Sequence, residues 1–307
     1  MSKYSEPCDP IAVVSEEVHD LNLGETSHNS LVLGQIQNSL KLTCAGTNDR
    51  GSSSTFHFGN ERKSQLLERA FTQDSDGDTY LHRYICQGEW QLAMNLIDIA
   101  PNCGYLNLQN HLQQTPLHLA AVMNNMKVTS KLLQMGADLS IVDSRGNNIF
   151  HIISQLGNQE ALKAVAGHLN DRPYLTTIQK AVNASNNEGV TPMIIAIRQR
   201  RDSILRQYPS FGADVNLTDK RNGESPLHEA VRSDNIACVD FLLKNCHADV
   251  NISDFRSVTP LHLSAGLGRE TVVACLLMNG ADLNLRDDEG RRPSDVTITA
   301  DLAELLR

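Results

Sequence analysis

Five histidines recur along the chain at nearly constant spacing, and histidine is a frequent catalytic acid, base and metal ligand. They are His82, His118, His151, His228 and His262. Each stands three residues after Thr, Ser or Asn, in the phrase Thr-Pro-Leu-His or a variant of it. A side chain that returns once per repeat belongs to the repeat rather than to one active site. We therefore predict that these histidines form hydrogen bonds that fix the loop geometry.

Three aspartates, Asp74, Asp76 and Asp78, resemble the start of a calcium loop. An EF-hand needs Gly at its sixth position and Glu at its twelfth, but Thr79 and Ile85 stand there. We therefore interpret the segment as a solvated acidic entry or as a site for a basic peptide.

Cys238, Cys246 and His247 lack a fourth ligand at zinc spacing, so we expect free thiols packed in a core. The sequence also contains no Gly-rich phosphate loop, nucleophile elbow or His-Glu-x-x-His motif. These observations predict that the protein has no catalytic residue, metal or cofactor and is not an enzyme. The odd total of seven cysteines without a Cys-x-x-Cys pair favours a reducing compartment.

The histidine phrase is part of an internal repeat. Its fourth position falls at residues 82, 118, 151, 194, 228, 262 and 295, in steps of 33 to 36 residues except for one of 43. A period near 33 with Thr-Pro-Leu-His is typical of ankyrin repeats. Thr or Ser caps a first helix and Pro occupies its first position, while Val128, Leu132 and Leu133 recur at the spacing of a second helix.

The repeats also depart from the pattern. Gly136, Gly212 and Gly280 are expected to end second helices in the left-handed conformation, where the fifth repeat has His247 instead. Pro209 should fray or bend the second helix of the fourth repeat. The step of 43 predicts a long loop near residues 167–186.

We therefore predict an all-α ankyrin-repeat solenoid of six repeats and a degenerate seventh, after a disordered N-terminal arm. The arm covers residues 1–72, which are rich in Ser, Asn, Gly and Thr, with a short helix over 62–71. The repeat domain covers 73–307, with repeats near 73–109, 110–143, 144–186, 187–219, 220–254 and 255–288 and a partial one at 289–307.

The formal net charge of −9 argues against direct nucleic-acid binding, which needs clustered Lys and Arg. No stretch approaches the ~18–20 apolar residues of a membrane span, and the start of the chain has no signal-peptide pattern. We expect a soluble intracellular protein without a membrane partner.

The first two repeats resemble those of the IκB family, the inhibitors of Rel/NF-κB transcription factors. The likeness extends over about residues 74–300 and also includes the lengthened third-to-fourth connection. The segments that carry it are Asp76-Gly77-Asp78-Thr79-Tyr80-Leu81-His82, Leu106-Asn107-Leu108-Gln109-Asn110-His111-Leu112-Gln113-Gln114-Thr115-Pro116-Leu117-His118 and Lys220-Arg221-Asn222-Gly223-Glu224-Ser225-Pro226-Leu227-His228.

The resemblance implies a regulator that binds Rel/NF-κB dimers and inhibits them. Its first repeats would hold the basic nuclear-localisation segment of a Rel subunit, and later repeats and hairpin tips would hold the dimerisation domains. By this resemblance, Asp76 and Asp78 are expected to contact the basic segment. The expected partner-binding residues are Asp74, Asp76, Asp78, Glu89, Gln109, Asn110, Gln113 and Gln114.

Two features of the signal-responsive members are missing, the Asp-Ser-Gly-x-x-Ser degradation motif and an acidic tail after the repeats. The chain is in this respect more similar to the atypical nuclear branch, so we favour the nucleus, with the cytoplasm as the alternative. The alternative function is a general ankyrin scaffold or adaptor for another protein.

Two further features have two interpretations each. Arg198, Arg200, Arg201 and Arg206 are either a nuclear-import or phosphate-binding patch or a solvated helix face, which we favour. Trp90 either packs at the end of the array, which we favour, or is a binding hot spot.

Overall fold

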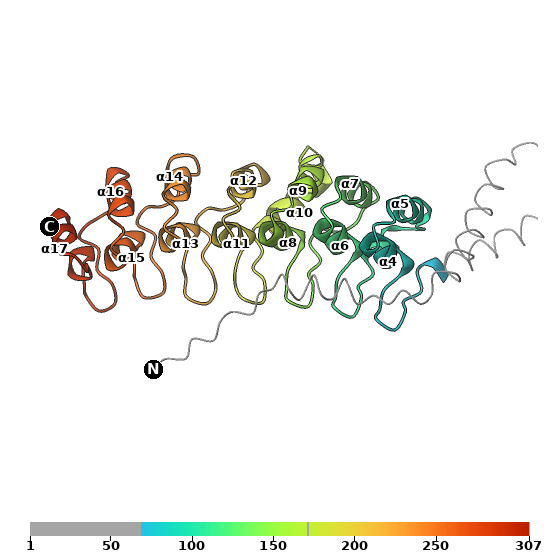
Figure 1. Cartoon of the computed structure of the whole chain (residues 1–307), viewed down its shortest axis with the longest axis horizontal. Coiled ribbons are helices and arrows are strands. Elements are labelled where there is room, and N and C mark those ends of the chain that lie inside the picture. The colour runs from blue at the N-terminus through green and yellow to red at the C-terminus, as the bar shows by residue number, and fades with distance from the viewer. Residues whose placement is uncertain (1–68, 171, 307) are drawn as a thin grey trace, which may run out of the picture. The chain divides into compact units, whose positions relative to one another are not determined.

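The computed structural model describes residues 69–170 and 172–306. Gln73–Arg307 is one compact unit, in which helices stack side by side in two rows (Figure 1). The arm predicted over 1–72 lies outside the described residues except for its last four. Of these, Arg69 and Ala70 are helical, within the helix predicted over 62–71.

Six repeats each supply one helix to an inner row and one to an outer row, and hairpins extend from the inner row along one edge (Figure 1). Each inner helix packs against the next along the row. The inner row is α4 (Tyr80–Cys86), α6 (Pro116–Val122), α8 (Ile149–Leu156), α11 (Pro192–Arg198), α13 (Pro226–Arg232) and α15 (Pro260–Gly266). The outer row is α5 (Trp90–Ile99), α7 (Met126–Gln134), α9 (Gln159–Ala166), α12 (Asp202–Leu205), α14 (Ile236–Lys244) and α16 (Glu270–Met278).

Short elements complete the array. The degenerate seventh repeat consists of the 3-10 helix η4 (Pro293–Asp295) and helix α17 (Ala300–Leu305). A 3-10 turn, η2 (Cys103–Asn107), follows α5 in the first repeat. The regular elements of the described residues are thus all helical, and the predicted ankyrin-repeat solenoid is confirmed.

The second repeat shows why these residues form this pair of helices. The Thr115 hydroxyl accepts the His118 backbone N–H, and Pro116 holds the first helical position, where a missing N–H costs nothing. Leu117 is buried in the inner helix, as are Leu132 and Leu133 in the outer one. Burying each such side chain contributes roughly 1.5–3 kcal/mol, so the interfaces between repeats form the core.

The recurring histidines brace each repeat to the next hairpin. The Nδ1 atom of His118 accepts the backbone N–H of Thr115 at 3.1 Å, and its Nε2 atom lies 3.1 Å from the Asn147 carbonyl oxygen. A carbonyl only accepts, so Nε2 carries the proton and the ring is neutral. The other four histidines make the same contacts, to the carbonyls of Gln114, Val190, Val258 and Arg291. The predicted loop-fixing role is confirmed.

The helix ends follow the predicted chemistry. Gly136, Gly212 and Gly280 have left-handed φ values of 88°, 79° and 86°, and His247 has a φ of 55°. Pro209 interrupts the outer helix of the fourth repeat as predicted. Helix α12 has only four residues, and the chain continues as the 3-10 helix η3 (Tyr208–Phe211).

The long loop predicted near residues 167–186 is wrong, because Arg172–Val182 forms the helix α10. Ile178, Ala181 and Val182 are buried on one side of it. The Tyr174 hydroxyl donates to the Leu133 carbonyl at 2.5 Å, which ties α10 to the end of α7. The apolar spacing of this helix is present in the sequence, but it falls outside the repeat pattern.

Acid should destabilise the array because burial lowers the pKa of His82, His118, His151 and His228, that of His151 to about 4. Below pH ~6.5 the unfolded chain binds protons that these buried rings cannot take up, so stability falls as the pH falls towards 4. For His151 the loss is up to roughly 2 kcal/mol between pH 6.5 and 5. Asp78, whose pKa is raised by burial, offsets part of this loss.

Urea unfolding should therefore show a lower midpoint at pH 5 than at pH 7.5. The drop should be smaller in His151→Gln, whose amide can still donate to the Val190 carbonyl. An equal drop in this variant would contradict the assignment of the pH dependence to the buried histidines.

Candidate functional site

Every hairpin tip is built around an Asp or Asn side chain that accepts two or more backbone N–H groups. In the first tip, Asp74 Oδ1 accepts the N–H of Asp76 at 3.0 Å and that of Asp78 at 2.9 Å. Such a turn satisfies backbone donors that have no helical partner. The same role falls to Asn110, Asp143, Asn186, Asp219, Asp254 and Asp287. We call these seven the turn residues.

Successive tips are joined by backbone hydrogen bonds. The residue after each turn residue donates its N–H to a carbonyl of the preceding tip, from His111 to Asp76 at 2.9 Å in the first pair. At the first tip a Cβ on Gly77 would lie 2.8 Å from the His111 backbone nitrogen, so this tip needs glycine, whereas Gln113 and Ser257 hold the same left-handed position in the second and sixth tips. The tips therefore form one ordered row with a defined order of exposed side chains.

Two of the three predicted aspartates are engaged within the fold. Besides its turn contacts, Asp74 lies 3.7 Å from Arg83 Nη1. Asp78 is 7% exposed and accepts a hydrogen bond of 2.9 Å from the Asn110 side-chain amide. Burial raises the pKa of Asp78, and the nearby charges of Asp74 and Asp76 act in the same direction. Asp78 thus joins the first tip to the second, and its carboxylate is not presented to a partner.

Asp76 is the aspartate whose carboxylate remains exposed and unengaged. It is exposed at the first tip, and its carboxylate forms no ion pair with another described residue. Asp74 on the same turn adds a second negative charge close to it. The predicted contact to a basic segment therefore rests on Asp76 rather than on Asp76 and Asp78 together.

The predicted amide residues surround the second tip. Gln109 is exposed, and its side-chain amide donates to the carbonyls of Gln113 at 2.6 Å and Val142 at 2.9 Å. Asn110 is the turn residue, and Gln114 supplies the carbonyl that accepts from His82. Gln113 is exposed with a left-handed φ of 58°. Gln113 and Gln109 are therefore accessible, while Asn110 mainly holds the turn.

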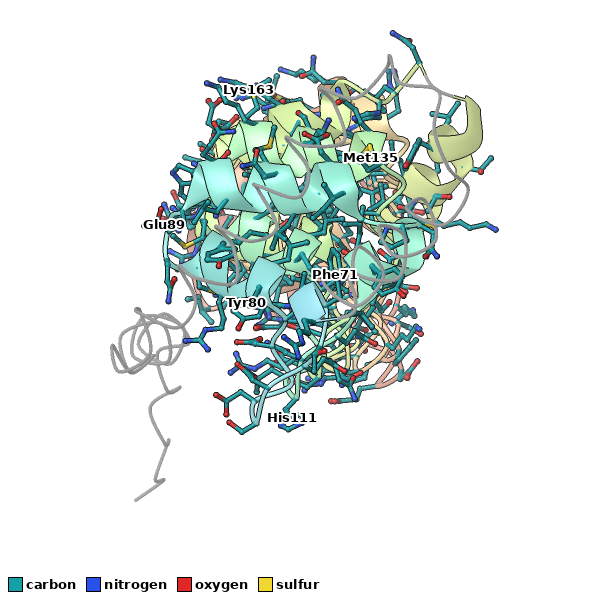
Figure 2. The ribbon with its side chains drawn as sticks, turned by 90° about the vertical axis from the view of Figure 1, so that its right-hand side faces the viewer. Phe71, Tyr80, Glu89, His111, Met135 and Lys163 are labelled. Carbon is teal, nitrogen blue, oxygen red and sulfur yellow. The ribbon has the colours of Figure 1, made fainter. Side chains whose placement is uncertain are left out.

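Glu89 is not part of this cluster, so the expectation of one acidic opening face that includes it is wrong. It is exposed in the turn between α4 and α5, at the opposite end of α4 from the aspartates. Figure 2 looks along the array from the α4 end and shows Glu89 well away from His111, which marks the second tip. Proximity in sequence misled here because a helix of seven residues separates the two groups.

The arginine cluster is mostly exposed to solvent, and its side chains also link neighbouring repeats. Arg198 forms a 3.0 Å ion pair with Glu229, and Arg200 donates to the Ser233 carbonyl at 2.8 Å. In addition, Arg201 donates to the Gln155 carbonyl, and Arg206 lies 5.0 Å from the centre of the Phe241 ring. The favoured solvated face is therefore confirmed in part, since Arg198, Arg200 and Arg206 are exposed and Arg201 is partly exposed. Trp90 is partly exposed at the start of α5, and both of its interpretations stay predictions.

Within residues 69–170 and 172–306, no group of His, Cys, Asp and Glu is placed to hold a metal ion. No helix in that part of the chain has the length and apolar character needed to cross a membrane. The first two tips offer one free carboxylate, two exposed amides and backbone groups, which suit a cationic peptide.

Sequence reasoning missed the turn residues and the side chains that follow them. The signal was present, since Asp or Asn stands eight or nine residues before the fourth position of every Thr-Pro-Leu-His phrase. Of the seven, Asp74 and Asn110 are in the expected partner-binding set, whereas their first role is to close the turn. The exposed residues His111 and Leu112 at the second tip were overlooked for the same reason.

The fold and its row of tips define a protein of the ankyrin-repeat class. The family model for three copies of the ankyrin repeat matches residues 202–287, and the single-repeat model matches 113–144. The crystal structure of the ankyrin repeat domain of Bcl-3, described as a unique member of the IκB protein family, aligns with a TM-score of 0.69 and 27% identity. It covers 76% of this chain and 100% of that one.

Similarity to known proteins identifies the family within the ankyrin-repeat class. NF-kappa-B inhibitor alpha of Gallus gallus is 33% identical over 231 residues, which cover 74% of this chain and 71% of that protein. The chain therefore belongs to the IκB family. It is also 31% identical to the nuclear factor NF-kappa-B p105 subunit of Gallus gallus over 75% of this chain, but spans only 23% of the length of that protein.

Asp78 provides a test of the inter-tip contact. Asp78→Ala should lower the free energy of unfolding by about 1 kcal/mol, because the part-buried Asn110 amide loses its acceptor. Asp78→Asn keeps an acceptor oxygen and removes a buried charge, so thermal unfolding should show little or no loss. Equal losses in both variants would mean that the charge of Asp78, and not its hydrogen bond, matters.

Proposed function

We propose that the chain binds Rel/NF-κB dimers and inhibits them, thereby modulating immune transcription. The basic nuclear-localisation segment of a Rel subunit lies against the first two tips, and the dimerisation domains lie on later repeats and hairpin tips. Membership of the IκB family supports the class of partner, and Asp76 supports the place of the basic segment.

The observation that carries the proposal is the unpaired, exposed Asp76 carboxylate on a tip that is held rigid. Asp74 and Asp78 fix the turn through hydrogen bonds, so little conformational entropy is lost when a ligand binds. A Lys or Arg side chain reaching Asp76 gains a charge-assisted contact, supported by the exposed amides of Gln109 and Gln113.

An interface above ~2,000 Å² suits a regulatory assembly of this kind, and the length of the array offers room for it. The role is binding rather than catalysis, and inhibition follows if the bound dimer can no longer reach DNA. We place the protein in the nucleus, with the cytoplasm as the alternative. The competing function is a general ankyrin scaffold for another protein.

Replacing Asp76 by Lys should weaken capture of a Rel homology domain roughly tenfold, since exchanging an attraction for a repulsion changes the binding free energy by about 1.4 kcal/mol. The loss should shrink at high salt, which screens exposed charges. Isothermal titration calorimetry with purified Rel domains measures both effects.

Glu188→Lys is the matched control, because Glu188 holds the same position on the fourth tip, with its N–H bonded to Asn186. It makes the same charge change and should leave the affinity for the isolated basic segment unchanged. If wild-type protein captures no Rel domain the proposal fails, and if both variants lose the basic segment equally the assignment to the first tip fails.

A further inference from the structure

The sixth tip carries an exposed aromatic ring where the other tips carry polar side chains. The position after the turn residue is Phe255 there, and it is 64% exposed. In the other six tips this position is Ser75, His111, Ser144, Asn187, Lys220 and Asp288. Single exposed apolar residues are common on protein surfaces, but among the seven described tips only Phe255 places a large apolar side chain at this position.

Phe255 is exposed but firmly held. Its backbone N–H donates to the Asn222 carbonyl at 2.9 Å, and Asp254 closes the turn through the N–H groups of Arg256 and Val258. The ring lies over Gly223, where an added Cβ would come within 2.5 Å of Phe255 Cδ1. One face of the ring is therefore fixed on the fifth tip, and the rest stays open to a ligand.

The same two tips carry three exposed cations. Lys220 and Arg221 are exposed, and neither forms an ion pair with any other residue that the structure describes. The third cation, Arg256, has a side chain that is 73% exposed, with Nη2 3.4 Å from Asp254 Oδ2. The three cations outnumber the two turn carboxylates of Asp219 and Asp254, so the surface keeps a small net positive charge on a chain whose total is −9.

We propose that Lys220, Arg221, Phe255 and Arg256, the basic-aromatic tip surface, bind a short acidic segment of a partner protein that carries a bulky apolar side chain. The apolar side chain packs on the open part of the Phe255 ring, and its neighbouring carboxylates pair with the three cations. Arg and a rigid aromatic residue are the side chains that most often dominate protein interfaces.

The neighbouring tips favour a short peptide over a nucleic acid. Glu188 is exposed on the fourth tip, and Asp288 and Glu289 are exposed on the seventh. A long phosphate backbone that followed the row would meet these carboxylates on both sides. A segment of a few residues fits between them. This surface is opposite in charge to the first tip, so the inference goes beyond the proposed function and does not rest on it.

The test uses the full chain and a short fluorescein-labelled peptide in which acidic residues flank a central Leu-Phe pair. Fluorescence anisotropy should show binding by the wild-type protein. The same peptide with Ser-Ser at its centre should bind at least about fivefold more weakly, because burial of the apolar pair is lost. A duplex DNA of equal charge should bind more weakly than the Leu-Phe peptide.

Phe255→Ser and Arg221→Glu should each weaken binding of the Leu-Phe peptide at least about fivefold. Ser already occupies the position of Phe255 in the first and third tips, so the turn accommodates it, and thermal unfolding checks this. Arg145→Glu is the matched control, since Arg145 is exposed at the position of Arg221 on the third tip, and it should leave peptide binding unchanged. Asp76→Lys should also leave it unchanged, which separates this surface from the proposed Rel site.

The inference is overturned if wild-type protein does not bind the peptide, or if the Ser-Ser peptide binds equally well. It is also overturned if Arg145→Glu weakens binding as much as Arg221→Glu, or if DNA binds more tightly than the peptide through the same residues.

Discussion

The structure depends on how each hairpin satisfies its own backbone. The tips lie outside any helix, so their N–H groups need acceptors, and a turn residue supplies them in all seven described tips. The histidine of the preceding repeat then donates to the last carbonyl of the turn, as His82 does to Gln114. The fourth repeat has Ile194 in place of the histidine, and there the Arg198–Glu229 ion pair links it to the next repeat. Stacking and turn closure are thus parts of one hydrogen-bonded system.

This constraint decides which side chains remain for function. Polar residues that close turns, such as Asp74 and Asn110, cannot be removed without loosening the row, while the side chains just after them are free to differ. The free positions are acidic at the first tip, with Asp76, and basic and aromatic at the fifth and sixth, with Arg221 and Phe255. One scaffold therefore carries surfaces of opposite charge at different tips.

Much of the fold could be predicted because short motifs in each repeat specify where helices begin and how the turns are held. Thr115-Pro116 marks a helix start, and the histidine three residues after the cap marks a brace. Helix α10 was missed because it interrupts the period, although Ile178 and Val182 have helical spacing. The candidate site was predicted less well. The sequence shows that Asp78 is acidic, but not that its carboxylate is buried and accepts a hydrogen bond from the Asn110 amide. The separation of Glu89 from the aspartates was missed for a related reason, because helix α4 lies between them.

The division between turn-closing and ligand-facing residues can be tested most directly by nuclear magnetic resonance of the isotopically labelled protein titrated with a Rel nuclear-localisation peptide. We expect backbone amide signals to shift at Asp76 and at residues 111–113, while those of the fifth and sixth tips stay in place. Shifts confined to the outer helices α5 and α7, or spread evenly over all seven tips, would contradict a basic-segment site at the first two tips.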